Sequence, residues 1–100
     1  MKTTITEENN TQVVRLEGRL DTAASAQVQA DVQPLIDDIH SDIILDCSNL
    51  EYISSSGLRI FLSILKSAKP KGHNVYIQGL NSELRNVFAI TGFINLFEFK

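Results

Sequence analysis

The hydrophobic period of the sequence changes repeatedly along the chain, which limits the folds that it can adopt. Residues 14–17 alternate apolar and polar side chains, as in a strand with one solvated face, whereas apolar side chains recur at helical spacing over residues 28–39. Apolar runs at 42–50 and 74–79 are each followed by another helical pattern. Strands separated by helices are expected to be parallel, and the first two strands, joined by a polar turn at residues 8–11, antiparallel. The predicted order is β-β-α-β-α-β-α-β, an α/β fold with packed helices on a mixed sheet of four to five strands.

Local signals predict where the first elements begin and end. Gly18 is expected to end the second strand, and Asp21 or Thr22 is a sound N-cap for the first helix. Pro34 lies inside that helix and removes one backbone donor, so we expect a kink or a break near residues 30–33.

The later elements are predicted in the same way. The continuous apolar run at residues 42–50 is typical of a parallel strand buried on both faces. A helix should begin near Ser56 and end at the segment Lys69-Pro70-Lys71-Gly72, and Asn81 or Ser82 should cap the next helix. Residues 95–99 are expected to form a last edge strand. The expected apolar stripe of the middle helix is Leu58, Ile60, Phe61, Leu62, Ile64, Leu65 and Ala68.

Length and composition limit the class of protein. One hundred residues fit one domain, expected to span 1–100, and 43% apolar with 21% charged residues is typical of a soluble globular protein. A net charge of −3 without a Lys/Arg cluster argues against nucleic-acid binding. No apolar run approaches the roughly 20 residues of a membrane-spanning helix, and the N-terminus has no signal-peptide core. We therefore expect a cytoplasmic domain without membrane insertion.

Three consecutive serines, Ser54, Ser55 and Ser56, stand between the central strand and the helix that follows it. Capping the helix needs one serine and not three. A nucleophilic serine would need a nearby base, but there is no G-x-S-x-G motif, and His40 and His73 precede their strands. No phosphate-binding glycine motif and no metal-ligand spacing are present, so we predict no catalytic residue, no cofactor and no metal. Two interpretations stay open: helix caps, or a serine that is a substrate for modification.

Three segments carry a resemblance to a known family. They are "EGRLD" after the second strand, "LDCSNLEYISSSGLRIFL" in the middle and "GLNSELRNVFAITGFINLFEF" at the end. Together they resemble the STAS family, and within it the bacterial anti-sigma factor antagonists, from about Ile5 to Phe99. The resemblance implies a binding module and not an enzyme. Many members continue into a further helix, so it also implies a partner surface or core cover beyond Lys100.

The family resemblance also implies partners and a switch. Members bind an anti-sigma factor that is also a GHKL-type serine kinase, which frees a sigma factor. The phosphorylated form is released, and a PP2C-type phosphatase resets the switch. The family motif is D-S-[ST/A]-G-[LI], in which the serine after the aspartate is phosphorylated. By this resemblance Ser55 is the acceptor, with Ser54, which replaces the aspartate, and then Ser56 as the next choices, and Gly57 and Leu58 match the motif.

A partner surface is expected around these serines. Asp21 and Thr22 should lie near a loop at residues 48–55, which Asp46 and Asn49 are expected to organise through turn hydrogen bonds. We expect Cys47 to be a small buried residue and Lys66 to lie on a solvated helix face. An alternative function is a STAS adaptor of a transporter ATPase or signalling scaffold, in which the serine is structural. The predicted partner-binding residues are Asp21, Thr22, Asn49, Ser54, Ser55, Ser56, Gly57, Arg59 and Ser63.

Overall fold

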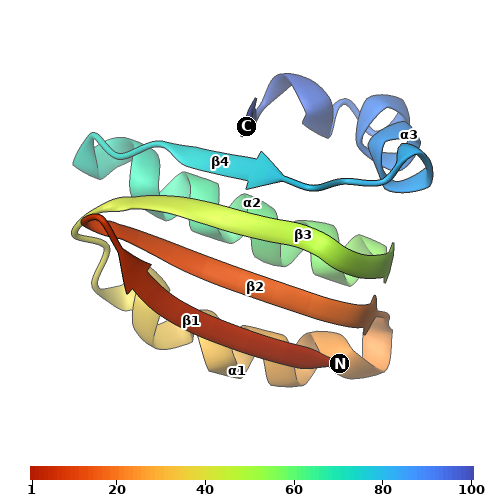
Figure 1. Cartoon of the computed structure of the whole chain (residues 1–100), viewed down its shortest axis with the longest axis horizontal. Helices are drawn as coiled ribbons and strands as arrows, with labels where there is room; N and C mark the ends of the chain where they lie inside the picture. The colour runs from red at the N-terminus through yellow and green to blue at the C-terminus, as the bar shows by residue number, and fades with distance from the viewer.

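A five-stranded mixed sheet organises the chain, and the computed structural model describes all of residues 1–100 (Figure 1). The strand order is β1-β2-β3-β4-β5; β1 and β2 are antiparallel and every other neighbouring pair is parallel. The predicted element order and α/β class are confirmed. The elements are β1 (Lys2–Glu8), β2 (Thr11–Leu20), α1 (Thr22–Asp37), β3 (Asp42–Ile53), α2 (Ser55–Ala68), η1 (Lys69–Lys71), β4 (Val75–Gln78), α3 (Ser82–Ile90), η2 (Phe93–Asn95) and β5 (Glu98–Phe99).

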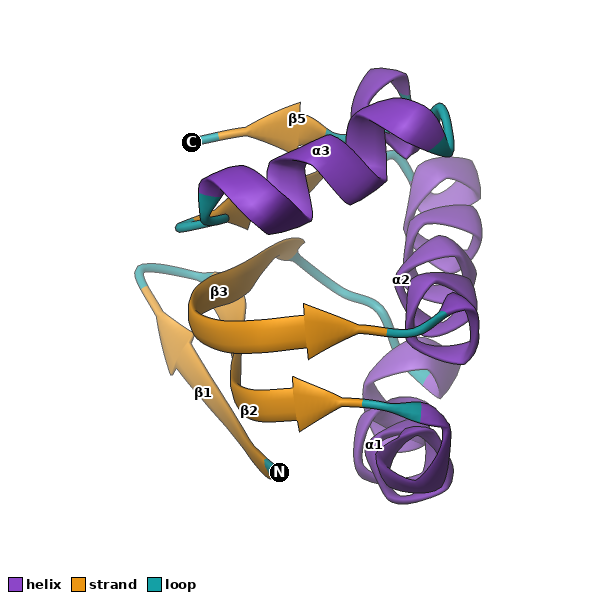
Figure 2. Cartoon of the chain, turned by 90° about the vertical axis from the view of Figure 1, so that its right-hand side faces the viewer, coloured by secondary structure: helices purple, strands orange, loops and turns teal.

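The sheet has one covered face and one open face. In Figure 2, α1 and α2 lie on the same side of β2 and β3. Along β3, Ile43, Leu45 and Cys47 are buried, whereas the alternate residues Ile44 and Asp46 are only half-buried. The prediction that this strand is buried on both faces is therefore wrong, because both long helices pack on the same side. No helix of the structure is long and apolar enough to cross a membrane.

The core fills the space between the covered face and the helices. In the middle of the core, Phe61 of α2 contacts Phe88 of α3 at a centroid distance of 6.0 Å and Phe97 at 6.5 Å. The predicted apolar stripe of α2 is buried except for Leu62, which is half-buried. These aromatic contacts tie α2, α3 and the last strand segment into one core.

Two predicted boundaries in the central strands are wrong. Gly18 does not end β2: with φ +104° it forms an irregularity, and the strand continues to Leu20. This extension pairs with β3, where Gly18 aligns with Leu50 and Leu20 aligns with Ile53. Residues 48–53, predicted as part of a loop, are therefore strand, because the prolonged β2 supplies their backbone partners.

Of the kink or break predicted near residues 30–33, the break does not occur, and the length predicted for the last strand is wrong. Helix α1 runs without interruption from Thr22 to Asp37. Pro34 and Ala30 are both exposed, so water can hydrogen-bond the Ala30 carbonyl that loses its helical donor. At the other end of the chain, α3 ends before Gly92 (φ +80°) and η2 follows, which leaves only Glu98–Phe99 as β5.

Candidate functional site

The first of the three serines is the N-cap of α2. Ser54 has an extended backbone, and its Oγ accepts a hydrogen bond from the Gly57 N–H at 3.2 Å. Its own N–H donates to the Leu20 carbonyl at 2.8 Å, which anchors it to the end of β2. Ser54 is only 8% exposed. The capping role predicted for Ser54 is confirmed, and its hydroxyl points into the structure and not to solvent.

The other two serines occupy the first turn of α2. Ser55 is the first helical residue, is exposed, and makes no side-chain hydrogen bond within the chain. Ser56 is half-buried and likewise makes none, so it is not the helix cap. Of the three hydroxyls, only that of Ser55 is both exposed and free of other bonds.

Gly57 permits a close approach between α2 and the two central strands. A Cβ at this position would lie 2.7 Å from Leu20 Cγ and 2.8 Å from Ile53 Cγ1. These contacts are shorter than van der Waals distance, so any larger residue would push the first turn of α2 away from the sheet. The neighbours of Gly57 are thus side chains of the two central strands. Gly57 is buried and therefore positions Ser55 without itself forming part of the surface.

The start of α1 lies beside the serines, as predicted, because β2 and β3 end together at Leu20 and Ile53 (Figure 1). Asp21 is the N-cap of α1, and its Oδ1 accepts from the Ala24 N–H at 2.8 Å. Thr22 follows and is exposed. Capping occupies one Asp21 carboxylate oxygen, and the turn contributes its outer surface to the site.

A polar cluster lies earlier on β3, where Asp46 and Ser48 precede the three serines. Asp46 accepts hydrogen bonds from Ser48 Oγ at 2.6 Å and from the Ser48 N–H at 3.1 Å, and Arg15 Nε lies 3.6 Å from its second oxygen. Burial alone would raise the pKa of Asp46, but the hydrogen bonds outweigh burial and the pKa is lowered. The predicted role of Asp46 is confirmed. Asn49 makes no side-chain hydrogen bond, so that part of the prediction is wrong; it is an exposed strand residue opposite Glu17.

Sequence inspection missed a glycine that completes this cluster. Gly79 has φ +80°, and a Cβ there would lie 2.7 Å from Ser48 Cα and 2.8 Å from Ser48 N. The glycine lets the loop between β4 and α3 lie directly against Ser48. Gly79 is the last residue of the strand predicted at 74–79 and stands two positions before Asn81, whose predicted N-cap role is confirmed. This position was the available signal.

The outer face of α2 extends the site away from the sheet. Arg59 and Lys66 are exposed, and Ser63 is half-buried.

Cys47 is fully buried within β3, and burial raises the pKa of its thiol to about 12. The prediction that Cys47 is a small buried residue is confirmed.

Comparison with known proteins identifies the family. The family model for the STAS domain matches residues 2–100. The chain belongs to the STAS domain family. BtrV of Bordetella bronchiseptica, a candidate anti-sigma factor antagonist, is 30% identical to this STAS domain over 97 residues, covering 97% of this chain and 84% of BtrV.

Solved structures show the same fold. A candidate anti-sigma factor antagonist from Thermotoga maritima superposes with a TM-score of 0.88 at 17% identity, covering 97% of this chain and 84% of that chain. The Bacillus cell fate determinant SpoIIAA in its phosphorylated form superposes with a TM-score of 0.74 at 22% identity, covering 99% of this chain and 91% of SpoIIAA.

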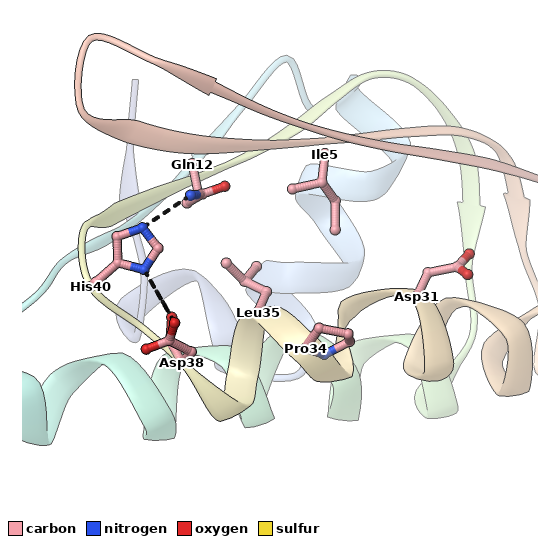
Figure 3. Close-up of a pocket in the computed structure, with 7 residues that line it drawn as sticks. All are labelled: Ile5, Gln12, Asp31, Pro34, Leu35, Asp38 and His40. Carbon is pink, nitrogen blue, oxygen red and sulfur yellow. Dashed lines mark hydrogen bonds and ion pairs between the residues drawn. The ribbon is translucent and has the colours of Figure 1, made fainter.

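The one pocket of this STAS domain lies far from the serines along the strands. It has a volume of about 230 Å³ between α1 and the first strands, with Ile5, Leu35 and His40 in its wall (Figure 3). His40 Nδ1 lies 3.0 Å from the Asp38 carbonyl oxygen, and this hydrogen bond, followed by that to Glu7, raises the pKa of His40. No predicted site residue lines the pocket. His40 and His73 both precede their strands, whereas the serines follow β3.

Proposed function

We propose that this STAS domain is an anti-sigma factor antagonist switched by phosphorylation of Ser55. Unmodified, it binds an anti-sigma factor that has GHKL-type serine kinase activity, and so releases a sigma factor from that partner. The observation that carries the proposal is the free, exposed hydroxyl of Ser55 beside two serines of lower exposure. The description of BtrV as a candidate anti-sigma factor antagonist supports the class of partner.

The switch requires one phosphoryl transfer in each direction. The kinase transfers the γ-phosphoryl group of ATP to Ser55 Oγ, releasing ADP and a proton. A PP2C-type phosphatase then hydrolyses the phosphoester with water and restores the serine. The chain itself is assigned no catalytic role, and its two histidines precede β3 and β4, whereas Ser55 follows β3. The solved phosphorylated form of SpoIIAA supports the view that this fold tolerates the modification.

The partner surface is centred on the start of α2. It comprises Ser55 at the start of α2, Thr22 at the start of α1, Asn49 of β3, and Arg59 and Ser63 on the outer face of α2, all exposed or half-buried. Ser54 and Gly57 are buried beneath it and fix its shape. Since sigma factors act with RNA polymerase, we place this interaction in the cytoplasm.

Electrostatics explains why phosphorylation would release the partner. A phosphoryl group adds close to two negative charges in the middle of the surface. Burying such a dianion without a matched cation costs several kcal/mol, and each ~1.4 kcal/mol lowers affinity tenfold. The free domain stays folded, because an anion at a helix N-terminus is favourable. Dissociation therefore follows from the interface and not from unfolding.

Phosphate mapping tests the proposal. The chain is incubated with its cognate anti-sigma factor kinase and ATP, and the modified residue is located by mass spectrometry. We expect one phosphate on Ser55 in the wild type and none in Ser55→Ala. The matched control Ser54→Ala should lose about 1 kcal/mol of stability through the lost cap, yet still be phosphorylated. Phosphate on Ser54 or Ser56, or no modification at all, would contradict the proposal, and the last result would favour the adaptor alternative.

A further inference from the structure

The exposed face of α2 brings Ser55 and Arg59 together. Both residues are exposed, and they are four positions apart within one uninterrupted helix. Side chains at this spacing lie one above the other, with Cβ atoms about 5–6 Å apart. The acceptor serine is therefore within reach of a guanidinium group supplied by its own helix.

Arg59 is the one arginine of this chain without a partner. The chain has four arginines, of which Arg15 pairs with Glu8 at 2.9 Å, Arg19 lies 4.5 Å from the centre of the Tyr52 ring, and Arg85 lies 5.1 Å from that of the Phe99 ring. Arg59 makes no ion pair, hydrogen bond or aromatic contact, and the sequence of α2 contains no acidic residue. Its guanidinium is available to an anion that is absent from the unmodified chain.

We propose that phosphorylation of Ser55 creates an ion pair with Arg59 within α2, so that the modification also removes this cation from the partner surface. This inference rests on the proposed function for the identity of the modified residue. The acidic group lies N-terminal to the basic one, which is the favourable order for a pair four residues apart. A guanidinium can donate two parallel hydrogen bonds to phosphate oxygens, which a lysine cannot do.

The pair gives the switch two effects from one modification. In the unmodified domain, Arg59 is free to contact an acidic group of the partner. After phosphorylation the new dianion occupies the same surface, and it also holds Arg59 in place. The partner then meets a surface that carries an added negative charge and no longer offers the positive charge of Arg59.

A phosphate titration tests the pair without any partner. Phosphoserine is incorporated at position 55 during translation, and the second ionisation of the phosphate is followed by ³¹P NMR. We expect the phosphate pKa to be lower with Arg59 present than in Arg59→Gln, by roughly 0.2–0.7 unit, as for an exposed ion pair. Lys66→Gln, which removes the other cation of α2, is the matched control and should leave the pKa unchanged. The other charged residues near this end of the sheet, Asp21, Arg19 and Glu51, are identical in every variant.

The outcomes separate this inference from the proposed function. Equal phosphate pKa values in the wild type and Arg59→Gln, or an equal effect of Lys66→Gln, would overturn the pair. A second measurement uses the unphosphorylated domain and its cognate anti-sigma factor, for which Arg59→Gln should weaken binding about 3–10-fold. Unchanged affinity would overturn the statement that Arg59 serves the partner. Absence of any binding by the wild type would overturn the proposed function while leaving the titration result intact.

Discussion

Replacing Gly79 with alanine should lower the free energy of unfolding strongly, although Gly79 contributes no side chain to the core. Gly79 has φ +80°, where an L-residue pays about 1–2 kcal/mol. Its Cβ would also lie 2.7 Å and 2.8 Å from the backbone Cα and N of Ser48, which cannot rotate away. Overpacking of this kind adds typically about 1–3 kcal/mol. The expected loss for Gly79→Ala is therefore about 2–5 kcal/mol.

Gly72→Ala is a closely matched control. Gly72 has φ +78°, nearly the same as Gly79, but a Cβ there would meet nothing within 4 Å. It should therefore lose only the conformational part, about 1–2 kcal/mol. Urea unfolding of the two variants and the wild type at pH 7 measures both losses. Equal losses would refute the argument that contact with Ser48 fixes the loop between β4 and α3.

Three further predictions concern the core, the buried thiol and the polar cluster. Phe61→Ala should cost about 3–5 kcal/mol in the same unfolding assay, because Phe61 is 1% exposed and its ring packs against those of Phe88 and Phe97. A nearly unchanged midpoint would mean that the inner face of α2 is misassigned. Cys47, with its pKa raised to about 12 and no exposed surface, should react with a thiol reagent at pH 8 only as fast as the chain opens; rapid labelling of the folded protein would contradict this. The lowered pKa of Asp46 contributes stability that is present above the unfolded pKa of about 4 and is lost as pH falls through the folded pKa. The stability difference between wild type and Asp46→Asn should therefore shrink on acidification below about pH 4, and a constant difference would argue against the hydrogen bonds from Ser48.

Local signals were sufficient to predict much of the fold. The N-caps Asp21 and Asn81 were identified because their side chains act on residues three positions away. The turn between β1 and β2 was found because residues 8–11 are polar, and Asn9 and Asn10 adopt positive φ there. These features depend on short stretches of chain, which the sequence displays directly.

Long-range packing decided the features that were predicted wrongly. Gly18 has the local character of a strand end, but β3 continues beside it and keeps β2 extended to Leu20. The apolar run at residues 42–50 does not reveal on which side the helices will pack, and only one face is covered. Pro34 is tolerated because its position in α1 faces solvent.

The place of the three serines between β3 and α2 was predicted, but the differences among them were not. Ser54, Ser55 and Ser56 have identical side chains, so the sequence cannot say which hydroxyl is buried. The cap geometry of α2 makes this distinction, since Ser54 Oγ is bonded to the Gly57 N–H while the next residue begins the exposed face. The contribution of Gly79 depends on the neighbouring strand and could not be read from its own segment.

If the charge on Ser55 controls partner binding, a calorimetric comparison of four forms of the domain will show it. Binding of the cognate anti-sigma factor is measured for wild type, Ser55→Ala, Ser55→Asp and the domain phosphorylated on Ser55. We predict nearly equal affinity for wild type and Ser55→Ala, weaker binding for Ser55→Asp with its single charge, and the weakest binding for the phosphorylated form. Equal affinities for all four proteins would contradict the account.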